Sequence, residues 1–447
     1  MSKALPLPHF VPGAPPEFNV QELLDVASRA RGKTCHRDPN DSGRGQFSFT
    51  VPISFDDGVE WIAKCPLSNA VKDPEVRRLM VESEVATLQL VRERTTIPVP
   101  QVFAWNSSDE NPVGTAYLIM SRASGRLLSD CGWYSWLSAD GSEMTLQQKC
   151  KIYSQLGRII HQLSLLRFPK IGSIFRVDPD AGFSVGQCIR VQTVEYGRAE
   201  RSVPRGPFSS ATEYYSMLAD VQADEIWDSD LYIGVFFDRF PRMENYAKGY
   251  RDNDYRKAID EWNERAERGA NTIENKLDRR VFADLLREMI PDMQLVYPDE
   301  ERFPLEHADL GTHNIFVDTD FNITCIIDWA LCSTVPVPTL LTHPPLPSRS
   351  YVLGMPEQQS FEQAFEQAFE EKERKMDPNR QLTRLLRSSH ERRDFDRFLH
   401  KDARVEDYSG FQRLFEWKLG TRNMRDYFAE RKERDFLQLR QELINPG

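Results

Sequence analysis

The chain has 447 residues, which is enough for two or three domains that each bury a core. Its 57 Lys and Arg residues against 68 Asp and Glu residues give a net charge of −11, which argues against broad affinity for nucleic acid. Seven cysteines without CxxC spacing argue against both a disulfide framework and a zinc site.

Signals for export or membrane insertion are not evident in the sequence. The first residues lack the apolar core of a signal peptide, and no run approaches the roughly 18 apolar residues that a membrane span requires. We therefore expect a cytoplasmic protein with no membrane partner. The sequence leaves its oligomeric state open.

The N-terminal part of the chain predicts a β-hairpin that carries a lysine. A Pro-rich lead and a helix occupy residues 1–30. Residues 47–55 and 60–65 each alternate apolar and polar side chains, and Asp57-Gly58 between them is typical of a tight turn. Lys64 lies in the second strand of this hairpin.

A helix and a further strand complete this region. Pro74 opens a stretch in which apolar residues recur at helical spacing and which ends before Pro98. Residues 117–120 are a short apolar run typical of a buried strand. We expect residues 31–120 to form a small lobe, an antiparallel sheet with one packed helix.

The remainder, residues 121–447, predicts a larger and mainly helical lobe. Thr145 and Gln148 form a capping box at the start of a helix with one apolar stripe. Further helices are expected at residues 211–226, 253–268 and 276–291.

A charged helical extension is expected at residues 360–447. Phe361, Phe365 and Phe369 recur at a spacing of four and line one helical face. Core packing is favoured over a stripe that binds a partner.

A block of polar residues within 305–329 carries the strongest chemical signal. Asp309 is followed five residues later by Asn314, and two short strands joined by a turn then fold Asn314 back toward Asp328. Phosphoryl transfer needs a carboxylate near the attacking hydroxyl, metal ions that bridge the phosphates, and a cation on them. This block supplies the first two.

Each group in the block has a chemical role and an alternative one. Asp309 is suited to orient or deprotonate the hydroxyl, while Asn314 and Asp328 offer the oxygen ligands that Mg²⁺ prefers. His307 is expected to brace the loop rather than to react. The alternative is a surface loop in which Asp309 and Asn314 act as turn or capping residues. The ordered combination of these residues favours the chemical interpretation.

Lys64 is the candidate cation, because a strand lysine fixed by a glutamate from a nearby helix can hold nucleotide phosphates. Glu82 and Glu84 compete as its partner, and apolar neighbours one turn away favour Glu84. The turn at residues 43–48, which contains Gly45, is the candidate loop over the phosphates, and an ordinary turn explains it equally well.

These residues resemble motifs of the aminoglycoside phosphotransferase and choline kinase-like family, closest in look to its uncharacterised fungal branch. The family's His-Gly-Asp-Leu-x-x-x-Asn and Ile-x-Asp-[Trp/Phe] elements are similar to His307-Ala-Asp309-Leu-Gly-Thr-His-Asn314 and Ile327-Asp328-Trp329. The resemblance extends over roughly residues 40–340. It implies an α+β, protein-kinase-like fold with a nucleotide-binding N-lobe and a helical C-lobe.

The resemblance also implies a role for each site residue, with ATP as co-substrate and Mg²⁺ as cofactor. Asp309 would be the catalytic base, Asn314 and Asp328 the magnesium ligands, and Lys64 with Glu84 the phosphate anchor. Met120 would be the gatekeeper, with the backbone of Ser121 and Ala123 facing the adenine. Two positions depart from the family pattern, Ala308 in place of glycine and Ser121 in place of an acidic residue.

Two other functions must be weighed. Gly182-Phe-Ser184-Val-Gly186 matches the nucleophile elbow of serine hydrolases, with His307 or His343 as base, but a hairpin explains it better because no buried strand and helix flank the serine. A kinase-like binding or scaffold protein is the second alternative. We predict an ATP- and Mg²⁺-dependent phosphotransferase that acts on a hydroxyl of a small molecule, whose identity the sequence does not specify.

Overall fold

The computed structural model shows two compact units built from interleaved segments. The described residues are 11–38, 42–133, 141–176, 178, 182–194, 203–227, 236–238, 241, 253–296, 302–344, 346, 357–388, 390–400 and 408–444. The first unit comprises 1–128, 165–207 and 304–334, and the second comprises 129–164, 208–303 and 335–447. The lobes predicted from the sequence are contiguous in the chain and their boundaries stay a prediction.

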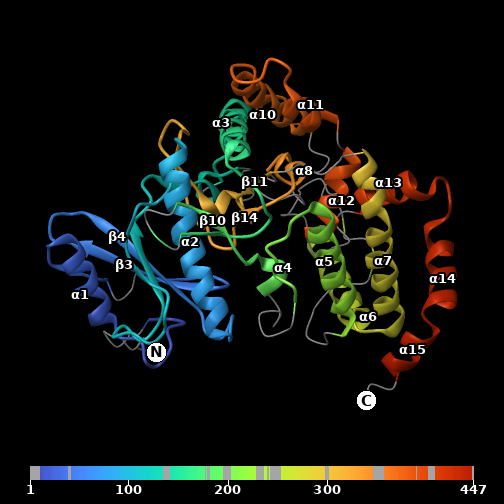
Figure 1. The fold of residues 1–447 in the computed structure, drawn as a ribbon, viewed down its shortest axis with the longest axis horizontal. Helices are drawn as coiled ribbons and strands as arrows, with labels where there is room; N and C mark the ends of the chain where they lie inside the picture. Colours follow the sequence, from blue (N-terminus) through green and yellow to red (C-terminus); the bar gives the residue numbers. More distant parts are fainter. Residues whose placement is uncertain are drawn as a thin grey trace. The chain divides into compact units, whose positions relative to one another are not determined.

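The first unit is organised around a six-stranded antiparallel sheet (Figure 1). Its strands run in the order β1-β3-β4-β6-β5, and β2 pairs with β3. Their bounds are Cys35–His36 for β1, Gly43–Arg44 for β2, Ser48–Phe55 for β3, Glu60–Pro66 for β4, Val102–Asn106 for β5 and Tyr117–Ser121 for β6. The predicted hairpin is β3 and β4, and in this register Lys64 lies opposite Thr50 on one side and Leu118 on the other.

Two helices, rather than the single one predicted, belong to this sheet. Helix α2 (Pro74–Arg94) begins at an Asp73 N-cap and carries the glutamates that compete for Lys64. Helix α1 (Val20–Arg31) buries Leu23 and Ala27 in the same core as the inward side chains of β3. The sequence pattern revealed the helical segment but not its packing partner, because an apolar stripe does not specify which surface it covers.

Strand β5 is a second difference from the prediction. It lies at the edge of the sheet, paired only with β6 among the described strands. Its side chains are mostly half-buried, and Trp105 is exposed. An edge strand that is wetted on both faces lacks the strict alternation by which half-buried strands are recognised.

Short strands build the segment that contains the polar block. The described ones are β7 (Arg126–Leu127), β8 (Arg167–Phe168), β9 (Ile174–Phe175), β10 (Ser184–Val185), β11 (Phe303–Glu306), β12 (Ile315–Val317), β13 (Ile323–Ile326) and β14 (Ser333–Thr334). The predicted pair of strands around the turn at 318–322 is confirmed as β12 and β13, and β7 pairs with the other edge of β12. Gly125 precedes β7 with a φ of 96°, and a Cβ there would meet the Val317 carbonyl oxygen at 2.4 Å, so only glycine fits.

The second unit consists mainly of helices among its described residues. Their bounds are α3 Leu146–Leu165, α5 Ala211–Asp224, α6 Asn253–Gly269, α7 Ile273–Val296, α8 Val337–Leu340, α10 Gln358–Glu373, α11 Gln381–Ser388, α12 His390–His400, α13 Tyr408–Leu419, α14 Met424–Asp435 and α15 Leu437–Ile444. The capping box of α3 is confirmed, since the backbone amides and side chains of Thr145 and Gln148 bond reciprocally. The predicted α+β class is therefore confirmed.

The C-terminal extension is part of the core of this second unit. Helix α10 lies against α3 so closely that a Cβ on Gly157 would meet the Phe365 carbonyl oxygen at 2.3 Å. Phe361, Phe365 and Phe369 are fully buried, which confirms core packing for this stripe. Further along, Phe411 of α13 stacks edge-to-face on Phe282 of α7 with ring centroids 4.7 Å apart.

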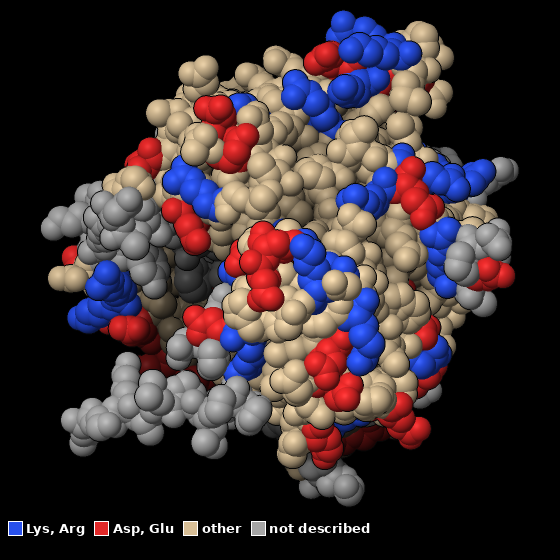
Figure 2. Space-filling model, turned by 90° about the vertical axis from the view of Figure 1, so that its left-hand side faces the viewer, with Lys and Arg blue, Asp and Glu red and all other residues tan. Residues whose placement is uncertain are grey.

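Charge on the surface is mixed. Figure 2 shows one face of the molecule, on which basic and acidic side chains lie in small groups separated by uncharged surface. None of the described helices combines the length and hydropathy that crossing a lipid bilayer would demand.

Candidate active site

Lys64 is the centre of an ion-pair network within the first unit. Its Nζ donates to Glu84 Oε1 at 2.8 Å and to Asp328 Oδ1 at 2.6 Å. The predicted partner is confirmed, because Glu84 is buried whereas Glu82 pairs with Arg78. One lysine therefore connects the sheet, helix α2 and the residue that follows β13.

The electrostatics keep this lysine charged. Burial alone would lower the pKa of Lys64, but the nearby carboxylates of Asp328 and Glu84 outweigh burial and raise the pKa. The Lys64 charge in turn is the main cause of a lowered pKa at Asp328. Burial raises the pKa of Glu84, and Lys64 offsets part of that effect.

Asp328 has a backbone conformation that favours glycine. Its φ is 62°, in the left-handed region, which Asp tolerates better than most side chains. The following Trp329 is buried and its Nε1 donates to the Ile326 carbonyl at 2.9 Å. The Ile326 amide donates to Pro98 O at 2.8 Å, which ties this strand to the connection after α2. The turn at Asp328 is therefore held from both sides.

Asp309 and Asn314 contact each other as the spacing predicted. The Asn314 amide nitrogen donates to the Asp309 carbonyl oxygen at 2.8 Å and lies 3.3 Å from Asp309 Oδ2. The backbone of Asn314 accepts from the Ile327 amide at 2.9 Å, so the β12–β13 hairpin does bring this loop next to the residue before Asp328. Asn314 is buried, while the Asp309 side chain is exposed.

His307 links the two halves of the block. Its Nδ1 accepts from the Asp309 amide at 3.1 Å, and its Nε2 lies 3.0 Å from the Ile327 carbonyl oxygen. Burial is the main cause of its lowered pKa, so the ring is neutral, and the two contacts assign the proton to Nε2. Trp329 packs edge-to-face against the ring at 4.7 Å. A neutral, fully bonded imidazole acts here as a brace.

His313 is a contact of Asp309 that the sequence interpretation missed. Its Nε2 lies 2.7 Å from Asp309 Oδ2, and this hydrogen bond is the main cause of a raised pKa at His313. A Cβ on Gly311 would meet the His313 ring at 2.6 Å, so the glycine makes room for the imidazole. The spacing of four between Asp309 and His313 was the available signal.

The proposed nucleotide contacts lie at three places in the sheet. The Gly45 amide donates to Ser48 O at 2.8 Å and closes the turn between β2 and β3. Met120 is buried in β6, next to Ser121. The Ser121 amide donates to Gln101 O at 2.9 Å, so this N–H is already used by the edge of the sheet. Ala123 lies in the loop just after β6.

The glycine-rich segment around Ser184 is a hairpin, as the better of the two interpretations predicted. Ser184 lies in β10, opposite Phe175 of β9, with its hydroxyl 3.5 Å from the Phe175 carbonyl oxygen. The next described helix, α4 (Val191–Val194), starts several residues later and has one turn. The strand, sharp turn and helix of a nucleophile elbow are therefore not formed here.

Metal binding has to be judged from the oxygen donors near Asp328. Within the described part of the chain, no group of three or more His, Cys, Asp or Glu side chains is arranged to hold a metal ion. Mg²⁺ does not need such a group, because it usually takes one or two protein ligands together with phosphate oxygens and water. Asn314 and Asp328 offer that kind of donor set.

Comparisons with known proteins agree with this site. A family model described as "Phosphotransferase enzyme family" matches residues 67–337, a span that contains Glu84, Asp309, Asn314 and Asp328 and starts just after Lys64. A "Subtelomeric hrmA-associated cluster protein" of Aspergillus fumigatus is 31% identical over 175 residues, which cover 36% of this chain and 31% of that protein. The chain thus matches about a third of the length of this relative.

Two solved structures are similar over most of the chain. A macrolide 2′-phosphotransferase type I is 14% identical, with a TM-score of 0.40 over 93% of this chain and 95% of that chain. An ethanolamine kinase of Plasmodium vivax is 11% identical, with a TM-score of 0.41 over 94% of this chain and 86% of that chain. The family match spans more than half of the chain, and the kinase-like α+β fold agrees with it. The chain belongs to the phosphotransferase enzyme family.

Proposed function

We propose that this protein transfers the γ-phosphoryl group of ATP to a hydroxyl of a small molecule in the presence of Mg²⁺. The observation that carries the proposal is the double contact of Lys64, at 2.8 Å from Glu84 and 2.6 Å from Asp328. A buried lysine held between two carboxylates provides a fixed cation for phosphates, which phosphoryl transfer requires.

Asp328 and Asn314 are the proposed magnesium ligands. Asp328 is kept ionised by Lys64, and the amide nitrogen of Asn314 already bonds to Asp309, which directs its amide oxygen to a cation. Bound Mg²⁺ would neutralise charge on the phosphate oxygens. The proposal requires Asp328 to exchange part of its contact with Lys64 for the metal.

Asp309 is the proposed base. Its exposed carboxylate accepts from His313 through Oδ2, which leaves Oδ1 for the hydroxyl of the acceptor. As the acceptor oxygen bonds to the γ-phosphorus, the bond to the bridging oxygen of ADP breaks and the hydroxyl proton passes to Asp309. His307 holds the backbone of the loop during this step.

The remaining ATP contacts follow from the sheet. Lys64 and Glu84 anchor the phosphates, and the Gly45 turn covers them with backbone amides. Met120 and the backbone of Ala123 face the adenine. Ser121 is a weaker candidate than the motif suggested, because its N–H is bonded to Gln101. A cytoplasmic location is part of the same proposal.

Binding of magnesium-dependent nucleotide is the first test of the proposal. Titration calorimetry of the wild-type chain with ATP, with and without Mg²⁺, should show binding that Mg²⁺ strengthens, and a thermal-shift assay should show stabilisation. ATP consumption should then be screened against amino-alcohols, aminoglycosides and sugars, with Asp309→Asn as the inactive control. Nucleotide binding without turnover on any acceptor, equal in wild type and Asp309→Asn, would favour a scaffold protein instead.

A further inference from the structure

Part of the first unit lies between helix α2 and the polar block. We call the described residues of 171–194 the bracket segment. They include β9, β10 and α4. On one side this segment packs into a buried apolar cluster with the N-terminal half of α2 and with the residues after Asp328. The members of that cluster include Val71, Val76, Leu79, Met80, Ile189, Val194 and Leu331.

The other side of the bracket segment is polar and centres on Arg190. Its guanidinium is only 5% exposed, and donates through one nitrogen to Ser333 Oγ at 2.8 Å and through the other to Glu306 Oε2 at 2.7 Å. Glu306 and Ser333 are register partners on β11 and β14. One guanidinium therefore spans a cross-strand pair.

That pair is the neck of the catalytic segment. Glu306 immediately precedes His307, and Ser333 follows Cys332, so residues 307–332 leave and return between these two strands. Every group assigned to the chemistry of the polar block lies within this span. The fork of Arg190 holds the two ends of the span together.

Further buried hydrogen bonds fix the bracket segment to the same neck. Ser173 Oγ donates to Cys332 O at 3.1 Å and accepts from the Ile189 amide at 3.0 Å. The Thr334 amide donates to Gly172 O at 2.8 Å. The position of the Arg190 backbone is set by its own amide, which donates to Thr193 Oγ1 at 3.1 Å. The bracket segment thus holds Arg190 rigidly against both strands.

We propose that the bracket segment positions the catalytic segment relative to helix α2, with Arg190 as the positioning residue. The apolar face follows α2, which carries Glu84, and the polar face follows the neck, which sets the place of Asp328. Lys64 bonds to both, so any slippage between them would separate its two carboxylates. This inference rests on the proposed function for its consequence, while the geometry itself does not.

The decisive variant is Arg190→Lys, which keeps the charge but cannot reproduce the planar fork that reaches Ser333 and Glu306 together. Arg77→Lys is the matched control. Arg77 is 8% exposed, lies on α2 and pairs with Asp109 at 2.6 Å, so it loses a comparable buried fork without touching the catalytic segment. Both substitutions should lower stability to a similar extent.

Hydrogen exchange followed by mass spectrometry separates positioning from stability. We expect Arg190→Lys to raise exchange of residues 307–332 about tenfold or more, while Arg77→Lys leaves this span as in wild type. Affinity for magnesium and ATP together should fall about tenfold in Arg190→Lys and remain unchanged in Arg77→Lys. Ser333→Ala, which leaves the ion pair in place, should show a smaller change of the same kind, and it serves if Arg190→Lys does not fold.

Equal exchange of residues 307–332 in Arg190→Lys and Arg77→Lys, or a Ser333→Ala variant that exchanges like wild type when Arg190→Lys is unfolded, would overturn the inference. Failure of the wild-type protein to bind ATP with Mg²⁺ would instead count against the proposed function. The exchange comparison would still decide the role of Arg190, because it requires no ligand.

Discussion

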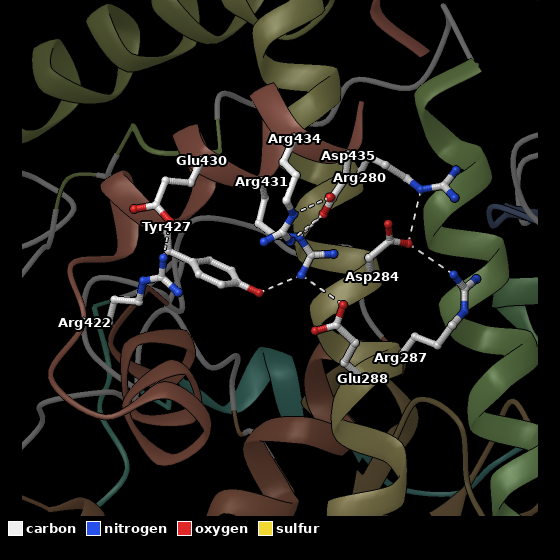
Figure 3. Close-up of polar contacts among 10 residues, drawn as sticks. All are labelled: Arg280, Asp284, Arg287, Glu288, Arg422, Tyr427, Glu430, Arg431, Arg434 and Asp435. Atoms are coloured by element: carbon white, nitrogen blue, oxygen red, sulfur yellow. Dashed lines mark hydrogen bonds and ion pairs between the residues drawn. The ribbon is translucent and has the colours of Figure 1, made fainter. Parts of the chain in front are cut away.

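The ion pairs around Lys64 and those around Arg431 use the same chemical groups in different ways. Arg431 lies in α14 and contacts Tyr427 Oη at 2.7 Å and Asp435 Oδ2 at 2.5 Å, each four residues away, and Glu288 of α7 at 2.9 Å (Figure 3). Lys64 contacts residues that are 20 and 264 positions away in the sequence.

The difference lies in what each network demands of the backbone. The Arg431 network joins side chains on regular helices, and its short spacings follow from the helical repeat. The Lys64 network includes Asp328, whose φ of 62° is uncommon for a residue with a side chain. Convergence of distant segments with local strain indicates function, whereas ion pairs along one helix indicate stabilisation of the C-terminal extension. Four substitutions test this contrast, in order of decreasing effect.

The largest effect is expected from Asp309→Asn, which keeps the contacts with Asn314 and His313 but removes the base. Turnover should fall by about 10²–10⁴-fold, the range for loss of a general base. Nucleotide affinity should be nearly unchanged, since Asp309 touches neither Lys64 nor Asp328 in the proposed arrangement. Steady-state assays on the acceptor found by screening measure both quantities. A variant with full turnover would remove Asp309 from the mechanism.

Glu84→Gln should weaken nucleotide binding by about 10–100-fold, because a hydrogen bond between charged groups contributes about 1.5–3 kcal/mol. Glu82→Gln is the matched control on the same helix, since Glu82 bonds to Arg78 and Ser107 instead. Calorimetric titration with ATP and Mg²⁺ measures the difference. Equal affinities in the two variants would refute the anchoring role of Glu84.

Arg431→Met should affect stability alone. Arg431 is buried and bonds to three groups, so its loss should lower the free energy of unfolding by about 1–3 kcal/mol. Urea denaturation measures this change. Binding of ATP and Mg²⁺, measured under conditions where the variant is folded, should match wild type, and a loss of affinity would contradict the contrast between the two networks.

Asp435→Asn should have the smallest effect, visible only through its dependence on pH. Hydrogen bonds from Arg434 are the main cause of the lowered pKa of Asp435, at about 2. The stabilisation is therefore complete above the ordinary carboxyl pKa and is lost as pH falls through about 2. Since the pair faces solvent, the difference in unfolding free energy at pH 7 should not exceed about 1 kcal/mol. A deficit that persists at pH 2 would contradict this assignment.

Sequence reasoning reached the local features of the site and missed the long-range ones. Glu84 was preferred over Glu82 because helical spacing reports which side chains face the core, and the hairpin that returns Asn314 toward Asp328 was evident from two apolar strands. These features depend on neighbours within a few turns or one hairpin.

Arg190 was not recognised because its partners are 116 and 143 residues away and its own segment has no periodic pattern. The same reason explains α1, whose helix was predicted but whose packing on the sheet was not. The edge strand β5 was missed because it is half-wetted on both faces. Tertiary contacts, rather than local propensity, decide these features.

The central claim is that Asp328 couples a metal ion to the lysine that anchors the nucleotide. Titration of ATP into wild-type protein and Asp328→Ala, each with and without Mg²⁺, tests it most directly. The account predicts that Mg²⁺ tightens binding to wild type but not to Asp328→Ala, which stays folded. A variant whose ATP affinity still rises with Mg²⁺ as much as that of wild type would contradict the account.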